Sequence, residues 1–555
     1  VKFTPLVKFL IVFAIIVNSV GMFFPLLQST YSPYFGSIAK HIVLTNNWTD
    51  LVLSNHDWLD KPHFPFWLTA LSFKIFGINS FAYIFPGFLF NVIGIYYTYR
   101  LARLWYPKEV GLLAALFTAT AMHLMLSSID VRAEAYLIGE IMPACYYWLK
   151  FEWQAKIKYL LWGAIFTALA LMTKGIFILI TIISGLAGLW IYNLQWKRFF
   201  SLKWLGALVL SLIFITPELM SLYLQFDLHP EKLIFGHTHV SGIRWYFWDS
   251  QFGRFFGSGP IMSSNPPPLH QLFFVHTFLW AYLPWWPMFF AATWRVINGV
   301  VRREKQSDSL ANAYFFTSFF VTFILFSLTT FQVDHYTNII FPFASIISAA
   351  WFYRIISQHQ KTHVIFYWQM VIAIICFIIV LVVSPIVFKG ADLFIIEFII
   401  ALGICALVLF LKRSWISKTI VYPVIAISVV FVVAMTANGV EYAKYDAGYQ
   451  MARYLNKDVK AQVLGYNIDL LGLDLHSTNP YVLIDDLTTV YTFPRPLYLV
   501  TTEDKMPEII DKFASVQIIG HFAGGSIETY MANVINNKRL EEKLTKYVIV
   551  KINPS

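Results

Sequence analysis

The sequence predicts a polytopic α-helical membrane protein that ends in a small soluble α/β domain. Hydrophobic residues make up 58% of the 555 positions and the mean hydropathy is +0.61, well above the values of an average soluble protein. Repeated apolar runs approach the roughly 20 residues that are needed to cross a bilayer. After residue 440 the apolar runs shorten to the length of strands.

Thirteen apolar segments are predicted to span the membrane. Before residue 440, 20 Lys and Arg residues fall on the side of the N-terminus and 9 fall on the other side. Because cytoplasmic loops carry the excess of basic residues, we expect a cytoplasmic N-terminus, with the first run retained as a span. The net charge of +10 then reflects topology, and no nucleic-acid partner is expected. The predicted spans are approximately 6–27, 80–101, 109–128, 134–150, 157–173, 175–194, 204–225, 271–294, 311–331, 335–353, 364–388, 392–411 and 419–438.

Residues 1–440 are expected to form the transmembrane domain, with long outer loops at 28–79 and 226–270. An odd number of spans places residues 441–555 outside, where short apolar runs alternate with helix-like stretches. We therefore expect a small extracytoplasmic α/β domain. Its predicted strands are Gln462–Tyr466, Pro496–Thr501, Val516–Gly520 and Tyr547–Ile552, and its predicted helices are Tyr442–Leu455 and Ile527–Leu544.

The first outer loop holds an unusual group of polar residues for a chain that is only 13% charged. Asp57, Asp60 and Lys61 lie there between two amphipathic stretches, Phe35–Thr45 and Phe66–Phe76, which are predicted to be short helices in the membrane interface. A membrane enzyme that works at the outer face needs acids, bases and cations at that face. The plain alternative is a solvated turn whose charges serve only solubility.

The second outer loop is short and places three charges at every second position, just where a span begins. Charged side chains near hydrocarbon cost free energy unless they have partners or line a polar cavity. The three residues are Asp130, Arg132 and Glu134. Glu134 is expected to lie deepest and to be a catalytic candidate. The alternative is a cap in which the three charges compensate one another.

The third long outer loop combines a His-x-His pair with an aromatic stretch that ends in an arginine. Arginine can bind phosphate through its planar fork, and the neighbouring aromatic side chains can stack on a sugar. Arg254 is therefore a candidate phosphate ligand, with Trp248 and Asp249 in support. His237 and His239 are candidate metal ligands, although a His-x-His pair alone is a weak signal.

Taken in order, these motifs resemble the GT-C superfamily of lipid-phosphate-sugar glycosyltransferases. The resemblance rests on Asp60-Lys61-Pro62 in the first loop, Arg132-Ala133-Glu134 in the second, the Trp-rich loop with a late arginine, thirteen spans and a C-terminal outer domain. Within the superfamily, the chain is similar to the bacterial branch related to protein O-mannosyltransferases and the lipid A aminoarabinose transferase.

The resemblance implies transfer of a sugar from a polyprenyl-phosphate carrier to a hydroxyl or phosphate acceptor, with inversion. The reaction is expected at the outer face of the bacterial inner membrane, where the acceptor is lipid A, another envelope glycan or a protein. Lys61 is implied to contact the carrier phosphate, with Arg254 as the second cation. Asp60 matches a position implicated in metal or substrate binding among relatives. The sequence requires no cofactor and leaves a divalent metal at Asp60 open.

The chain departs from the family pattern where relatives have an aspartate soon after the first span. Tyr31 stands at that position, and Glu134 stands where relatives usually have aspartate. The general base is therefore expected to be Glu134, with Asp60 or Asp57 as alternatives.

A transporter or a noncatalytic protein that binds the lipid carrier are the rival interpretations. Glu140, Glu218 and Glu397 fall inside predicted spans, where a carboxylate marks an ion or proton pathway by default. Glu218, in Thr216-Pro217-Glu218, has no evident partner in the sequence. Against transport stand the charged outer loops, the extra soluble domain and the lack of a visible internal repeat.

Overall fold

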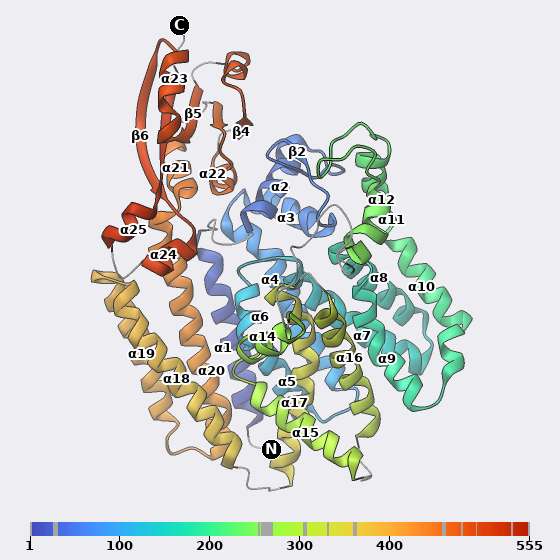
Figure 1. Cartoon of the computed structure of the whole chain (residues 1–555). Coiled ribbons are helices and arrows are strands. Elements are labelled where there is room, and N and C mark those ends of the chain that lie inside the picture. Colours follow the sequence, from blue (N-terminus) through green and yellow to red (C-terminus); the bar gives the residue numbers. More distant parts are fainter. Residues whose placement is uncertain are drawn as a thin grey trace.

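A bundle of long helices carries, at one end, two short helices of the predicted first loop and a β-sheet (Figure 1). The N-terminus lies at the opposite end of the bundle. The structure is a computed structural model, and it describes residues 3–25, 32–253, 256, 270–302, 308–329, 332–358, 363–457, 462–478, 481–494, 497–533 and 537–552.

Helices dominate the described part of residues 1–440. The longer ones are α1 (Thr4–Ser19), α4 (Ser80–Ala102), α5 (Lys108–Ala119), α7 (Ala133–Gln154), α8 (Ile157–Lys174), α9 (Ile178–Tyr192), α10 (Leu202–Phe214), α15 (Trp286–Val301), α16 (Ser309–Leu328), α17 (Phe341–Ser357), α18 (His363–Val387), α19 (Gly390–Leu409) and α20 (Trp415–Thr436). The shorter ones are η1 (Val20–Phe23), α2 (Ser32–Thr45), α3 (Phe64–Phe76), α6 (Met122–Ser127), η2 (Trp196–Phe200), α11 (Thr216–Leu222), η3 (Tyr223–Asp227), α12 (Gly242–Arg244), η4 (Trp245–Gly253), η5 (His270–Leu272), α14 (Phe273–Ala281), η6 (Asp334–Ile340) and η7 (Ala437–Glu441). A small hairpin, β1 (Val52–Leu53) with β2 (His56–Asp57), lies between α2 and α3.

The helices confirm a polytopic membrane protein. Within the described ranges, eight helices are long and apolar enough to cross a membrane, and the pair Leu202–Phe214 and Thr216–Asp227, bent by 46°, makes a ninth candidate. Each of the thirteen predicted spans falls on a helix or on consecutive helices. Several of these are short, broken or polar, so the count of thirteen stays a prediction.

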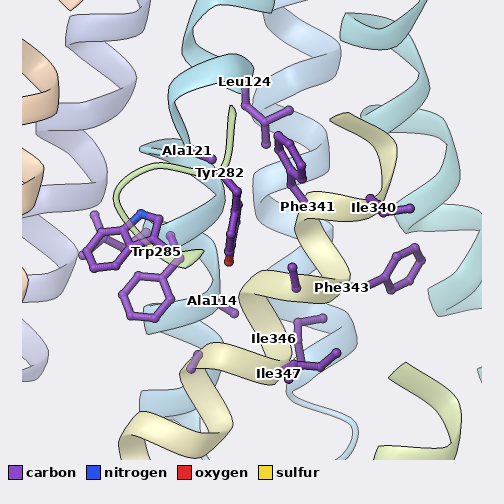
Figure 2. Close-up of a cluster of buried hydrophobic side chains, with 14 of the residues drawn as sticks. Ala114, Ala121, Leu124, Tyr282, Trp285, Ile340, Phe341, Phe343, Ile346 and Ile347 are labelled. Atoms are coloured by element: carbon purple, nitrogen blue, oxygen red, sulfur yellow. The ribbon is translucent and has the colours of Figure 1, made fainter. Parts of the chain in front are cut away.

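Besides the bent pair, the predicted spans 109–128 and 271–294 are broken, between α5 and α6 and between α14 and α15, and these two breaks meet in the core of the bundle. The N–H of Met122, at the start of α6, donates to the carbonyl of Leu283 (2.9 Å), and the Trp285 indole donates to Thr120 Oγ1 (3.0 Å). Figure 2 shows Tyr282 and Trp285 among the apolar side chains of α5, α6 and α17. Each broken helix thus supplies partners for the backbone of the other, as a lipid-embedded break requires.

The C-terminal residues form a five-stranded sheet in the order β4-β3-β5-β7-β6, parallel among the first three strands and antiparallel at β7 and β6. All four predicted strands are confirmed, and β4 is an addition that the sequence pattern did not predict. The strands are β3 (Gln462–Tyr466), β4 (Tyr481–Ile484), β5 (Leu497–Thr502), β6 (Val516–Gly524) and β7 (Thr545–Ile552). The helices are η8 (Tyr442–Tyr445), α21 (Ala447–Leu455), α22 (Leu471–His476), η9 (Leu487–Thr492), η10 (Glu503–Lys505), α23 (Met506–Lys512), α24 (Ile527–Asn533) and α25 (Asn537–Lys543).

Helix α22 packs directly against α2, so the sheet region is joined to the first loop. Leu475 of α22 enters the apolar cluster beneath α2, at a place where Gly36 leaves room for it. The buried Lys40 Nζ donates to the carbonyls of Asp474 and Ser477 and lies 3.7 Å from the Asp474 carboxylate. Burial lowers the pKa of Lys40, while Asp474 acts in the opposite direction.

Candidate functional site

Two cavities lie near the outer loops, and together their linings include five of the ten predicted site residues that the structure describes: Asp60, Lys61, Asp130, Arg132 and Glu134. The Lys61 cavity, about 90 Å³, is lined by the first loop, α8, α11, η4 and η6, including Asp60, Lys61, Pro62, Lys174, Glu218, Trp245, Tyr246, Gln251 and Tyr336. The Arg132 cavity, about 300 Å³, is lined by α6, the start of α7, η6 and the end of α20, including His123, Asp130, Arg132, Glu134, Asp334, His335 and Asn438.

The Asp60-Lys61-Pro62 motif faces the Lys61 cavity. The Lys61 ammonium lies 2.7 Å from Asp60 Oδ2, and the two side chains keep 21% and 25% exposure. The cation is therefore accessible to a ligand while its position is fixed by a neighbouring carboxylate. Aromatic residues of η4 form the opposite wall.

A buried anchor follows the motif directly. Glu218 of α11 accepts from the His63 backbone N–H (2.9 Å) and lies 3.0 Å from its Nδ1, while His63 Nε2 lies 2.9 Å from the Thr49 carbonyl. The structure thus supplies Glu218 with a partner that was not evident in the sequence. Its carboxylate ties the predicted seventh span to the first loop and fixes the segment that presents Lys61.

An ion pair between Glu134 and Lys174 connects the two cavities. Glu134, in the first turn of α7, lines the Arg132 cavity and is 2% exposed, whereas Lys174, at the end of α8, lines the Lys61 cavity. Lys174 Nζ also lies 3.7 Å from the centroid of the Tyr336 ring. The second carboxylate oxygen of Glu134 faces His335 Nε2 at 3.9 Å.

In the Arg132 cavity, the Arg132 guanidinium contacts both Asp130 and His335. It forms two bonds to Asp130 Oδ2 (2.7 and 2.9 Å), and its Nη1 donates to His335 Nδ1 (3.0 Å). Neighbouring charges and hydrogen bonds raise the pKa of Arg132 despite the opposing effect of burial, which is the largest single influence. The Asp130–Arg132–Glu134 group is therefore more than a self-compensated cap, because it extends to His335.

The remaining polar side chains of the Arg132 cavity come from α6, η6 and η7. Asp334 Oδ1 lies 3.2 Å from His335 Nδ1, and Asp334 Oδ2 lies 3.7 Å from His123 Nε2. His123 Nδ1 faces Asn338 Oδ1 at 2.7 Å. Carboxylate, imidazole, guanidinium and amide groups in one cavity suit the binding of a polyhydroxylated or anionic molecule.

Several predicted site residues lie outside the linings of the two cavities. Asp57 accepts from Lys232 and Gln225 (2.9 Å each), Asp249 pairs with Arg244 (3.4 Å), and Trp248 is exposed and stacked on Phe252. Arg254 and Tyr31 lie outside the described residues.

The predicted metal ligands do not come together. His239 Nδ1 lies 3.2 Å from the neighbouring Thr238 hydroxyl, and His237 pairs through its backbone with Ile234. Among the residues that the structure describes, no three His, Cys, Asp or Glu side chains are grouped in a way that could hold a metal ion. Asp60 has Lys61 as its ion-pair partner.

Sequence reasoning did not assign Lys174, Asp334, His335 or Tyr336 to the site, and it considered Glu218 only under the transporter interpretation. Lys174 and Asp334-His335-Tyr336 stand at the ends of predicted spans on the outer side, which was the available signal. The pairing of Glu134 with Lys174, however, joins two loops, and the order of residues alone does not say which loops meet.

The fold defines the class of protein: a polytopic helical membrane protein with a C-terminal sheet domain. The fold matches the crystal structures of ArnT from Cupriavidus metallidurans, with TM-scores of 0.72 for the form bound to undecaprenyl phosphate and 0.71 for the apo state. Sequence identity is 15% and 14%, and the matches cover 100% and 99% of this chain and 99% and 98% of the ArnT chains. At such identities the likeness establishes the fold alone.

Sequence comparison gives a narrower relationship. Residues 60–220 match the family model of dolichyl-phosphate-mannose-protein mannosyltransferases. The undecaprenyl phosphate-alpha-4-amino-4-deoxy-L-arabinose arabinosyl transferase 2 of Proteus mirabilis (strain HI4320) is 23% identical over 312 residues, 54% of this chain and 51% of that protein. An uncharacterized protein of Aquifex aeolicus (strain VF5) is 26% identical over 144 residues, 26% of this chain and 29% of that protein. The chain thus spans about half or less of the curated relatives that it matches. The predicted resemblance to GT-C glycosyltransferases is confirmed.

Proposed function

We propose that this protein is a glycosyltransferase that moves a sugar from a polyprenyl-phosphate carrier to an envelope acceptor at the outer face of the bacterial inner membrane. One observation carries the proposal: the Glu134–Lys174 ion pair joins a cavity that presents Lys61 to a second cavity rich in hydrogen-bonding groups. Transfer between two substrates needs two such sites in contact.

The Lys61 cavity is the proposed donor site. When the bond between the anomeric carbon and the phosphate oxygen breaks, its electron pair leaves with the phosphate, so negative charge grows there. Fixed cations stabilise that charge in the transition state. Lys61 supplies one cation at the cavity surface, Arg254 is the proposed second, and Lys174 lines the same cavity. The aromatic wall of Trp245 and Tyr246 suits the apolar face of the sugar or the first isoprenoid units.

The Arg132 cavity is the proposed acceptor site, and it contains the proposed base. One oxygen of Glu134 is occupied by Lys174, and the other faces this cavity. Glu134 would take the proton from an acceptor hydroxyl as its oxygen forms the new bond to the anomeric carbon. Attack from the side opposite the phosphate inverts the configuration at that carbon. Asp60 remains the second candidate base. Asp57 is a weaker one, because Lys232 and Gln225 already engage its carboxylate.

The proposed topology places the N-terminus in the cytoplasm and residues 441–555 on the outer side of the inner membrane. The distribution of Lys and Arg residues supports this orientation. Single cysteines introduced at Lys543, in α25, and at Lys156, before α8, would test it, because both positions are exposed. A membrane-impermeant thiol reagent applied to intact spheroplasts is expected to label the first and spare the second, and the reverse pattern would overturn the orientation.

The activity itself is tested with purified protein in vesicles that contain a polyprenyl-phosphate sugar and lipid A. Mass spectrometry is expected to show an acceptor that has gained one sugar, together with free polyprenyl phosphate. Envelope glycans and proteins replace lipid A in parallel reactions, since the acceptor is unassigned. Ion flux driven by the lipid substrate without any sugar transfer would instead support the transporter interpretation.

The three acids in predicted spans give that rival little support. Glu218 anchors His63, Glu140 accepts from Thr173 (2.8 Å), and Glu397 lies on the exposed face of α19. They belong to three separate helices, α11, α7 and α19, and only Glu218 lines one of the two cavities.

A further inference from the structure

A long apolar groove runs along the outside of the bundle between α1 and α19, with α20 as its floor. It encloses about 430 Å³, and its lining is almost wholly apolar, with Phe9, Phe13, Leu402, Ala406 and Ile425 among its residues. Both α1 and α19 pack against α20, and the groove opens between them. Helix α19 has only 17% of its apolar stretch buried, the least of the eight candidate spans in the described ranges.

The groove adjoins a polar cavity at the end of the bundle that is remote from the Lys61 and Arg132 cavities. Leu6 and Phe410 line both spaces, so the two adjoin at these side chains. The polar cavity, about 650 Å³, adds Lys412, Arg413 and Ser417 to its lining. Within the described part of the chain, the side chains of Lys412 and Arg413 are exposed and have no ion-pair partner.

The start of α20 lies at the same polar cavity and adds to its attraction for an anion. Ser414 caps this helix by accepting from the Ser417 N–H (3.4 Å), and both residues line the cavity. The N-terminus of a helix carries a partial positive charge. This partial charge adds to the charges of Lys412 and Arg413.

We propose that the adjoining groove and polar cavity bind an anionic phospholipid of the bilayer. Lys412 and Arg413 would hold the headgroup phosphate, and one acyl chain would lie in the apolar groove beside Phe9 and Ala406. In a membrane a gap of this kind must be filled, and an acyl chain has the width and the chemistry to restore the lost packing. Two cations that have no ion-pair partner among the described residues favour an anionic headgroup over a zwitterionic one. A bound lipid would fasten the weakly packed α19 to α1.

The proposed topology places this site at the cytoplasmic leaflet, whereas the sugar-transfer site lies at the other face. The bound phospholipid is therefore distinct from the donor carrier. The inference does not depend on the proposed catalytic activity, because it rests on the groove, its cations and the membrane-spanning fold.

Native mass spectrometry of the full-length protein in detergent, titrated with phosphatidylglycerol, tests the proposal. We expect one tightly retained phosphatidylglycerol and an affinity for phosphatidylcholine that is about tenfold weaker. Equal retention of the two lipids would overturn the proposal. Displacement of phosphatidylglycerol by an equal concentration of undecaprenyl phosphate would assign the groove to the carrier and would likewise overturn it.

Two variants distinguish the contribution of the headgroup to binding from that of the acyl chain. Lys412→Ala/Arg413→Ala should weaken phosphatidylglycerol binding about tenfold. Phosphatidylcholine, whose headgroup also carries a phosphate, should lose a smaller factor, so the preference for phosphatidylglycerol narrows. The control Lys156→Ala/Lys158→Ala removes two exposed basic residues at the start of α8, which line neither space, and should bind as the parent protein does. Ala406→Trp, which fills the groove, should abolish retention of both lipids while size-exclusion chromatography still gives the parent profile. Retention by the Ala406→Trp variant, or equal effects of the two double variants, would overturn the proposal.

Discussion

Glu218 and His63, 155 positions apart in the sequence, form a buried pair in which one carboxylate receives the backbone N–H at 2.9 Å and faces the imidazole Nδ1 at 3.0 Å. The pair is 0–1% exposed. It follows Asp60-Lys61-Pro62 directly, so it determines where the predicted phosphate ligand lies. A residue inside a predicted span thus acts on the proposed donor site through the backbone of the first loop.

The Glu218→Ala variant should be strongly destabilised, because the buried amide and imidazole of His63 lose their acceptor. The loss is expected at about 3–5 kcal/mol of unfolding free energy. The Glu218→Gln variant keeps an acceptor oxygen and should lose less. Thermal unfolding in detergent measures both. The control Glu231→Ala removes an exposed carboxylate from the neighbouring loop and should change little. An unchanged stability of Glu218→Ala would show that the pair does not hold the loop.

Removal of the Lys61 ammonium should weaken binding of the carrier. A hydrogen bond to a charged group contributes about 1.5–3 kcal/mol, so Lys61→Ala should raise the dissociation constant for undecaprenyl phosphate roughly 10- to 100-fold. Lys74→Ala is the matched control: this lysine of α3 lies in the same loop but bonds to Asn46, outside the cavity lining. Equal affinities of the two variants would remove Lys61 from the donor site.

The Glu134→Gln variant should separate chemistry from binding. If Glu134 accepts the acceptor proton, its amide analogue should lower kcat by about 10²–10⁴-fold and leave the dissociation constant of the carrier within about threefold. Single-turnover transfer and carrier titration on the same preparation provide the comparison. Glu109→Gln, in the first turn of α5 and outside both cavities, should retain full activity. A Glu134→Gln variant with parental kcat would shift the role of base to Asp60.

Lys40 connects the sheet region to the first loop, and its removal should loosen that contact. Lys40→Met leaves the carbonyls of Asp474 and Ser477 without their donor, so hydrogen exchange in α22 should accelerate by roughly tenfold or more. Lys543→Met, at an exposed position in α25, is the control. Unaltered exchange in α22 would mean that apolar contacts such as that of Leu475 suffice to dock the helix.

The sequence predicted those helices and strands whose pattern of apolar residues is clear over their whole length. The amphipathic pattern of Phe35–Thr45 and Phe66–Phe76 predicted α2 and α3 closely, and apolar runs of strand length predicted the four longer strands of the sheet. Strand β4, Tyr481–Ile484, has only four residues, too few to stand out as an apolar run. The breaks between α5 and α6 and between α14 and α15 were not predicted either, because the residues at each break are as apolar as the helices on both sides.

The site was predicted in its parts but not in its connections. Asp60, Lys61, Arg132 and Glu134 line the two cavities, as their loops suggested. Asp57, in contrast, is engaged by Lys232 in a different loop. Such pairings depend on which loops meet in space, and that is decided by helix packing far from the motifs.

The Glu134–Lys174 pair permits a test that separates structural support from participation in the reaction. Lys174→Met alone leaves a carboxylate that is 2% exposed without its cation, which should cost about 3–5 kcal/mol of unfolding free energy. The double variant Lys174→Met/Glu134→Gln removes both charges, so most of that stability should return.

If Lys174 serves only to neutralise Glu134, sugar transfer in the double variant should equal that of Glu134→Gln alone. If it also stabilises the departing phosphate, transfer should fall a further 10- to 100-fold while stability is restored. Unfolding curves and single-turnover rates for the parent protein, the two single variants and the double variant complete the double-mutant cycle. A double variant as unstable as Lys174→Met would show that the lysine contributes through its contact with the Tyr336 ring rather than through the carboxylate.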